Sequence, residues 1–302
     1  MKFYYFGGVM GDPNNLKSPS RLEAHHFSGV MFTHDIPEGD MFVKAAVDIK
    51  PNEKIKYLVA IRPYTISPQY LSMINQSIDR MSKDRLQINL ISGYIKDYES
   101  DVGGIVGPIT DSSNSIDRSN YLIKFLQILD EMEQKNYKTY HYDPEYKNKL
   151  DLFVSVTNKF SFAEAKKYNK KIIFPYSTYS RGTWTDHRYN PTPPPDDAFD
   201  LSGMDVMLAL TPIIRKTKEE LEKLTDYAMR PAWKDGEIPA VVGDVGYFTY
   251  EEFDDFVQTL EKKGINYLLL NAVPGEEVEV IVPFIKQYVE TRNKLDKRIS
   301  EK

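Results

Sequence analysis

The sequence predicts an α/β protein that folds as a closed (β/α) TIM barrel in a single domain, residues 1–302. Short apolar segments alternate with amphipathic segments about eight times, and no linker separates two halves of the 302 residues. This alternation is typical of parallel strands covered by helices, and ~250 residues is a usual size for such a barrel. A doubly wound open sheet is the alternative, but no G-x-G-x-x-G motif follows the first strand.

The expected strands are eight short segments rich in β-branched or aromatic residues, each bounded by polar residues or glycine. They are residues 2–6, 29–32, 56–61, 86–91, 151–156, 171–174, 205–210 and 267–270. Helices are expected where apolar residues recur at a spacing of three to four. They are residues 21–27, 40–48, 68–81, 116–135, 162–168, 218–229, 248–263 and 277–295.

Local signals support these boundaries. Ser67 and Pro68 open the helix 68–81, because serine is a good N-cap and proline fits the first helical position. Two long segments lack periodicity: residues 95–115, which are polar and glycine-rich, and residues 176–204, which contain the run PTPPPDD. We therefore expect a long loop at about 176–204.

The composition excludes several classes of protein. A net charge of −5 disfavours a nucleic-acid binder, and the absence of cysteine excludes disulfides, thiolate metal sites and a cysteine nucleophile. The five histidines show no H-x-x-x-H spacing, so no metal site is expected. No secretory signal is present, and no apolar run approaches the ~20 residues of a membrane span. The sequence predicts a soluble, cytoplasmic protein with neither a membrane nor a nucleic acid as partner.

Polar residues gather where the expected strands end, which in a TIM barrel is the active face. They are Thr33, His34, Arg62, Ser92, Gly93, Thr157, Asn158 and Thr211. This set lacks the paired carboxylates of a glycosidase. Hydroxyls and amides suit a cofactor that brings its own reactivity. Asn89 lies inside the fourth strand, where its amide either serves a ligand or is satisfied by neighbouring groups of the barrel.

Residues 57–94, YLVAIRPYTISPQYLSMINQSIDRMSKDRLQINLISGY, resemble the bacterial luciferase-like flavin-dependent monooxygenases, especially the alkanesulfonate monooxygenase branch. The shared features are a strand ending in R-P, a helix opened by S-P, a D-R-x-S-x-x-R turn and a strand with N-x-x-S-G. Residues 208–221 and 241–285 resemble later units of the same family. The family fold is a TIM barrel.

The resemblance implies a flavin site. Arg62, Asn89, Ser92 and Gly93 would lie along the flavin ring or its ribityl chain. The phosphate would be held at a helix N-terminus, by Thr157, Asn158 and Ser161. The implied activity is oxygenation of a small organic substrate with reduced FMN, supplied by a separate flavin reductase, and O2. A deazaflavin-dependent oxidoreductase and a non-catalytic flavin-binding protein are the alternatives.

The sequence departs from the alkanesulfonate branch at its R-x-H triplet, which is here Ala209, Leu210 and Thr211. Because related enzymes close a mobile loop over their cofactor, we expect residues 176–204 to be a lid. Candidates for catalytic contacts are Arg181 and His187 of this loop and His34 at the end of the second strand. Outer helices rich in tyrosine and phenylalanine suggest a homodimer.

Overall fold

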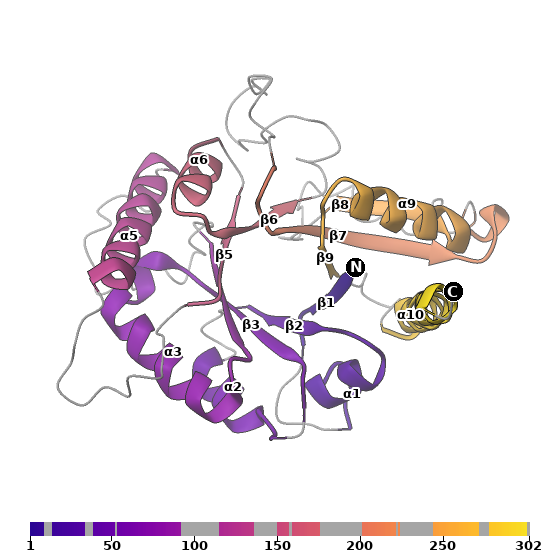
Figure 1. Cartoon of the computed structure of the whole chain (residues 1–302), viewed down its shortest axis with the longest axis horizontal. Coiled ribbons are helices and arrows are strands. Elements are labelled where there is room, and N and C mark those ends of the chain that lie inside the picture. The colour runs from indigo at the N-terminus through magenta and orange to yellow at the C-terminus, as the bar shows by residue number, and fades with distance from the viewer. Residues whose placement is uncertain are drawn as a thin grey trace. The chain divides into compact units, whose positions relative to one another are not determined.

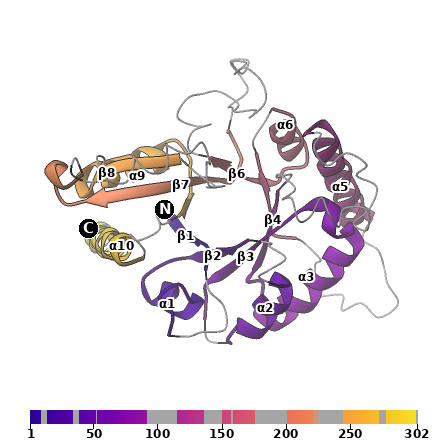
Figure 2. The same cartoon turned by 180° about the vertical axis from the view of Figure 1, so that it is seen from behind.

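The computed structural model describes most of the chain (Figures 1 and 2). The described residues are 1–8, 14–33, 39–51, 53–91, 115–135, 150–156, 159–175, 201–221, 223, 244–271 and 278–300. The strands are β1 (Lys2–Phe6), β2 (Gly29–Phe32), β3 (Lys56–Ile61), β4 (Leu86–Leu90), β5 (Leu152–Ser155), β6 (Lys171–Pro175), β7 (Val206–Arg215), β8 (Asp244–Thr249) and β9 (Tyr267–Leu270). All eight predicted strands are confirmed, and the seventh is longer than predicted.

Of the helix predicted at residues 218–229, only residues 218–221 and 223 are described, and they are helical. The remaining helices of the described residues follow the predicted positions closely. They are α1 (Pro19–Ala24), α2 (Met41–Asp48), α3 (Pro68–Ser82), α5 (Ser115–Lys135), α6 (Lys159–Lys167), α9 (Tyr250–Lys262) and α10 (Val278–Ser300), with a short 3-10 helix η2 (Pro63–Thr65). Ser67 is the N-cap of α3, since its side chain accepts a hydrogen bond from the backbone N–H of Tyr70, as expected. None of the described helices is long and apolar enough to cross a membrane.

The chain divides into two compact units, and the single domain expected from the sequence stays a prediction. The unit that spans residues 32–173 carries β3, β4, β5 and most of β6 as parallel neighbours. Its register places Asn89 of β4 opposite Ala60 of β3 and Phe153 of β5. In this unit α2 and α3 lie side by side against the outer face of the strands (Figures 1 and 2).

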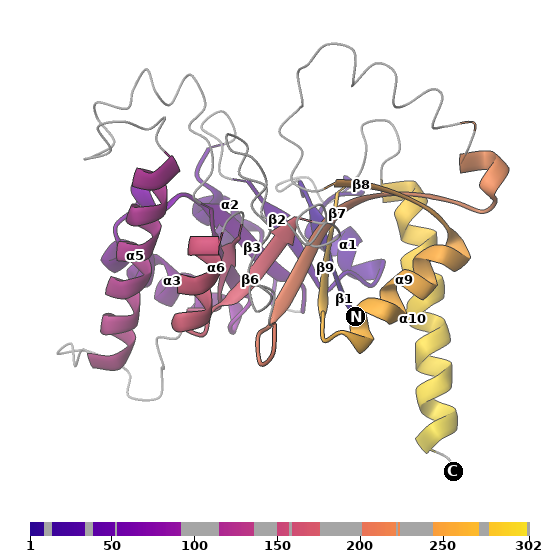
Figure 3. The ribbon, with the colours of Figure 1, turned by 90° about the horizontal axis from the view of Figure 1, so that it is seen from above.

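The other unit contains β1, β7, β8, β9 and helices α1, α9 and α10. Strand β1 pairs in parallel with β2 and β9. Strand β7 pairs with β9 over its first half and with β8 from Leu210 to Arg215. Helices α9 and α10 lie next to each other (Figure 3), and the rings of Phe253 and Phe284 meet edge to face at 4.6 Å.

The strands follow the order of a closed (β/α) TIM barrel, which confirms the predicted fold class. Strand β8 was not predicted and comes in addition to the eight predicted strands. Thr211 and Pro212, which we expected just after the seventh strand, lie within β7 instead, because β8 pairs with this extension.

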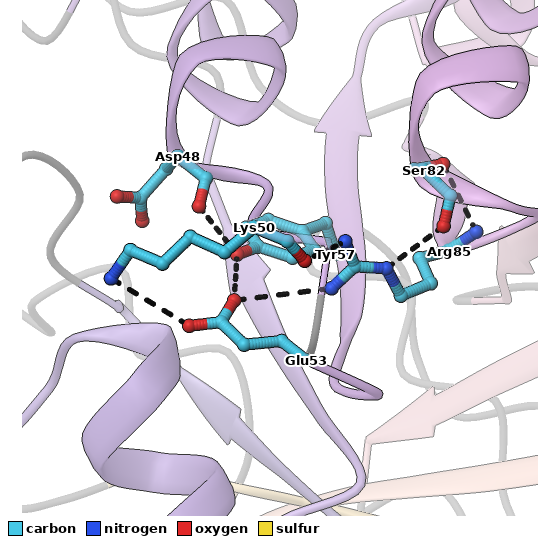
Figure 4. A network of polar contacts seen from close by, with 6 residues as sticks. All are labelled: Asp48, Lys50, Glu53, Tyr57, Ser82 and Arg85. Atoms are coloured by element: carbon cyan, nitrogen blue, oxygen red, sulfur yellow. Dashed lines mark hydrogen bonds and ion pairs between the residues drawn. The ribbon is translucent and has the colours of Figure 1, made fainter.

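A network of polar side chains joins the N-terminal ends of β3 and β4 to the segment after α2 (Figure 4). The Tyr57 hydroxyl lies 3.1 Å from both the Asp48 carbonyl oxygen and Oε2 of Glu53. Arg85 donates from Nη2 to the Lys50 carbonyl and from Nε to the Ser82 carbonyl, at 2.5 and 2.9 Å. Burial, followed by the charge of Glu53, raises the pKa of Tyr57 far above its ordinary value. This end of a barrel serves stability.

Candidate functional site

Asn89 is a fully buried amide inside an otherwise largely apolar strand. Only 1% of its surface is exposed, and its Oδ1 accepts a hydrogen bond of 3.0 Å from the Ser155 hydroxyl. Ser155 is the last residue of β5 and stands two positions beyond Phe153, the register partner of Asn89. Side chains two apart share a face of a sheet, so the two polar groups meet on one face across adjacent strands. Neighbouring groups thus satisfy at least part of the Asn89 amide.

Arg62 brings a buried cation to the same face. It follows β3 directly in extended conformation, with φ −99° and ψ 128°, so the alternation of the strand continues through it. Arg62 therefore shares the face of Ala60, which is in register with Asn89. Its carbonyl oxygen accepts from the N–H and Oγ1 of Thr65, at 3.0 and 2.8 Å, which fixes the turn at η2. The side chain is only 5% exposed.

Arg62, Asn89 and Ser155 thus form one set, the β3–β5 polar set, at the C-terminal ends of three adjacent parallel strands. It offers a guanidinium, an amide and a hydroxyl, and none of its members is a carboxylate. A second polar pair, Gln87 and Asp151, lies on the same face near the other ends of the strands, with Nε2 donating to Oδ2 at 2.8 Å. Because a barrel builds its active face at the C-terminal ends, only the β3–β5 polar set is a candidate site.

Ser161 stands in the first turn of α6 and is 2% exposed. The sequence placed the start of this helix at residue 162, and the structure corrects it to Lys159. Ser161 is therefore part of the helix rather than of the preceding loop. Backbone N–H groups of a first helical turn have no partner within the helix, and the helix dipole favours an anion there. The position suits the phosphate contact that the resemblance implies.

The remaining site candidates fall outside the described residues. They are His34, Ser92, Gly93, Thr157, Asn158, Arg181 and His187, together with the expected lid at 176–204. The described chain reaches Thr33, Ile91 and Val156, the residues just before three of these segments. Their proposed roles stay predictions. Ser155 was not singled out from the sequence, since the only available signal was a hydroxyl at the end of an apolar strand.

No family model matches the sequence. Solved structures of similar fold exist. A riboflavin lyase, solved with modified FMN and riboflavin, has a TM-score of 0.63 at 13% identity and covers 98% of this chain and 92% of its own. An EDTA monooxygenase from Chelativorans sp. BNC1 has a TM-score of 0.60 at 11% identity, with 98% and 94% covered.

A third similar structure is an F420-dependent secondary alcohol dehydrogenase, solved with an F420-acetone adduct. Its TM-score is 0.59 at 13% identity, and the match covers 94% of this chain and 96% of the dehydrogenase. These TM-scores and coverages establish a common fold over nearly the whole length of each chain, and at identities this low they establish the fold alone. They leave the alkanesulfonate branch without specific support.

Proposed function

Since the chain has the fold of the luciferase-like flavin-dependent enzymes, we propose that it is an oxidoreductase that binds a flavin-type cofactor over the β3–β5 polar set. The observation that carries this proposal is the gathering of Arg62, Asn89 and Ser155 on one face, at the C-terminal ends of their strands. Arg62 and Asn89 are buried and Ser155 is half-buried, and polar groups at such positions need hydrogen-bonding partners, which a bound ligand can supply in addition to the protein. A flat heterocycle with carbonyl and ring-nitrogen edges is such a partner.

Each member of the set has a distinct role in this proposal. Arg62 supplies a fixed positive charge, which favours a reduced flavin because that form carries negative charge on its pyrimidine edge. Asn89 hydrogen-bonds the same polar edge of the ring. Ser155 does not contact the cofactor but holds the Asn89 amide in one orientation. The donor set fits the cofactor chemically, since an edge rich in acceptors meets a guanidinium and an amide.

The phosphate end of the cofactor would lie at the N-terminus of α6. Ser161 is the described residue that supports this placement, and Thr157 and Asn158 complete the proposed contacts. Ser92 and Gly93, which follow β4 after Ile91, would pass close to the ring. The small side chains of these two residues leave room for the backbone to approach a ligand.

The choice between FMN and a deazaflavin decides the reaction. With reduced FMN and O2, the chain would act as a monooxygenase on a small organic substrate and would depend on a separate flavin reductase. With F420 it would transfer a hydride without oxygen. One of the similar structures was solved with modified FMN and another with an F420-acetone adduct. We favour FMN, because the local match at residues 57–94 resembles monooxygenases. In either case the bound group supplies the redox chemistry, and the protein binds, orients and excludes water.

A cofactor panel separates these readings. Purified protein is titrated with FMN, riboflavin and F420, each oxidised and each reduced under anaerobic conditions, and binding is followed by absorbance and fluorescence. Preference for reduced FMN supports the monooxygenase, and preference for F420 supports the hydride-transfer enzyme. Binding of FMN without oxygen uptake on any substrate tested, when reduced FMN is regenerated by an added reductase, favours the non-catalytic flavin-binding protein.

A further inference from the structure

Strand β1 has one face that packs against helices and one inner face. Phe3 and Tyr5 mark the helical face, because their rings meet those of Tyr288 on α10 and of Phe27 just after α1, at 5.5 and 5.8 Å. Side chains alternate along a strand, so Tyr4 lies on the inner face. Residues of β2, β7 and β9 that are level with Tyr4, and those two positions further along, share this inner face.

One row of the inner face lies where β1 and β9 reach their C-terminal ends. Its members, one from each strand in the order β7, β9, β1 and β2, are Thr211, Asn271, Phe6 and Met31. Each stands two positions beyond the register row Ala209, Leu269, Tyr4 and Gly29. The backbone N–H of Asn271 donates to the Leu210 carbonyl at 3.0 Å, so the pairing of β7 with β9 continues to this level. We call these four residues the Thr211 row.

Thr211 brings a buried hydroxyl to this row. The residue is only 2% exposed, and its Oγ1 has no hydrogen-bond partner within the described part of the chain. A buried hydroxyl without a partner lowers stability, and such a group in a native protein calls for an explanation. Asn271 is half-buried and, on a neighbouring strand ~4.8 Å away, adds an amide with two donor hydrogens. An acceptor oxygen held between the two side chains would satisfy the Thr211 hydroxyl.

The other half of the Thr211 row is apolar, and none of its four members carries a charge. Met31 is 2% exposed and Phe6 is half-buried. The charged residue on the inner face of β1 is Lys2, which lies at the opposite end of the strand with its Nζ 5.1 Å from the centre of the Tyr267 ring. An anionic head group would therefore lose its hydration in this row without gaining a cation there.

We propose that the Thr211 row binds an uncharged organic substrate that presents a carbonyl oxygen. The oxygen has two lone pairs and accepts hydrogen bonds from the Thr211 hydroxyl and the Asn271 amide. The apolar body of the substrate lies against Phe6 and Met31. A carbonyl compound thus meets two donors and an apolar wall, whereas a carboxylate or sulfonate of the same length meets no opposite charge.

Three probes of equal chain length test the charge of the ligand: 2-hexanone, hexanoate and hexane-1-sulfonate. Saturation-transfer difference NMR measures their dissociation constants on the cofactor-free protein and again with saturating FMN. We expect 2-hexanone to bind at least ~10-fold more tightly than either anion. The inference rests on the proposed function only in taking this ligand for the substrate of the flavin reaction. Because the first series contains no flavin, a failure to bind FMN in the cofactor panel leaves its result unaffected.

Thr211→Val keeps the shape of the side chain and removes only the hydroxyl. We expect it to weaken binding of 2-hexanone at least ~5-fold and to raise Tm by roughly 2 °C, because no buried hydroxyl is left without a partner. The matched control is Thr249→Val, since the Thr249 hydroxyl is the exposed N-cap of α9 and accepts from the N–H of Glu252 at 3.2 Å. This control should lower Tm and leave the affinity for the ketone unchanged.

Asn271→Asp is the second variant, in which an acceptor replaces the amide donor at nearly the same shape. It should weaken binding of 2-hexanone by a similar factor, and circular dichroism checks that each variant is folded. Either anion binding as tightly as 2-hexanone overturns the inference, as does a wild type that binds none of the three probes with or without FMN. Affinities for 2-hexanone that match the wild type in both Thr211→Val and Asn271→Asp also overturn it.

Discussion

The Ser155 hydroxyl donates to Oδ1 of Asn89 over 3.0 Å, joining the end of β5 to the interior of β4. This bond occupies the amide oxygen and directs the amide nitrogen of Asn89 away from Ser155. We therefore predict that Asn89 would meet a ligand as a hydrogen-bond donor, which suits a carbonyl or an unprotonated ring nitrogen at the edge of a flavin.

We predict that Ser155→Ala lowers the free energy of unfolding by about 1 kcal/mol and weakens cofactor binding several-fold, because the Asn89 amide loses its fixed orientation. The matched control is Gln87→Ala, which breaks the bond to Asp151 at the other ends of the same strands. It should cost similar stability without affecting the affinity for the cofactor. Cofactor affinity is measured by fluorescence titration. Equal losses of affinity in the two variants would show that Ser155 has no specific role in the cofactor site.

Arg62→Met is predicted to weaken binding of reduced FMN at least ~10-fold more than binding of oxidised FMN, because the reduced ring carries a negative charge that the oxidised ring lacks. Arg62→Lys should keep part of this preference. Arg85→Met is the control, since Arg85 is as deeply buried but lies in the network before β4. If Arg62→Met reduced both affinities by the same factor, the charge would have no role in recognising the reduced form.

The phosphate prediction concerns the N-terminus of α6. Ser161→Ala, and separately the double variant Thr157→Ala with Asn158→Ala, should weaken FMN about tenfold and riboflavin hardly at all, because riboflavin lacks the phosphate. Isothermal titration with both ligands measures the difference. A parallel loss for FMN and riboflavin would place the phosphate elsewhere.

Alkaline pH should destabilise the protein through Tyr57. Burial and then Glu53 raise the pKa of this phenol above its unfolded value of about 10, so the folded state retains the proton that the unfolded state loses. The contribution of the protonated Tyr57 phenol to the free energy of unfolding is complete below pH ~10 and decreases as the pH rises above that value. Tyr57→Phe should cost about 1 kcal/mol at pH 8 through lost hydrogen bonds.

The same substitution should also flatten the decline in stability between pH 9 and 11.5. Urea unfolding of the two proteins across this range gives the comparison. Curves that run parallel would show that Tyr57 does not titrate as its surroundings imply.

The sequence was sufficient to predict the barrel fold, because each buried strand is a short apolar run that can be recognised without its neighbours. The sequence did not predict that β7 continues beyond Leu210, because Thr211 and Pro212 suggested that the strand ends there. Proline is tolerated in a strand where its missing N–H is not needed for pairing. Whether β7 continued depended on pairing with β8, a distant segment, so no local signal near Pro212 could reveal it.

The site was only partly predictable for a similar reason. Arg62 and Asn89 stood out as polar residues next to or within apolar strands, and the structure places both on one face. Ser155 became visible only through the register of β4 and β5, which the sequence does not specify. The onset of α6 was predicted three residues late because Phe160 and Ser161 have only modest helix propensity, although they belong to its first turn.

Anaerobic titration of the wild type and of Asn89→Leu with reduced FMN tests the central claim most directly. Leucine has the same branched shape and the same number of side-chain heavy atoms as asparagine but cannot hydrogen-bond, so the variant stays close to the packing of β4 and loses the contact. The account predicts saturable binding of one FMN per chain by the wild type, and at least ~10-fold weaker binding by a folded Asn89→Leu. A wild type that binds neither reduced FMN nor F420, or a variant that binds as well as the wild type, would contradict it.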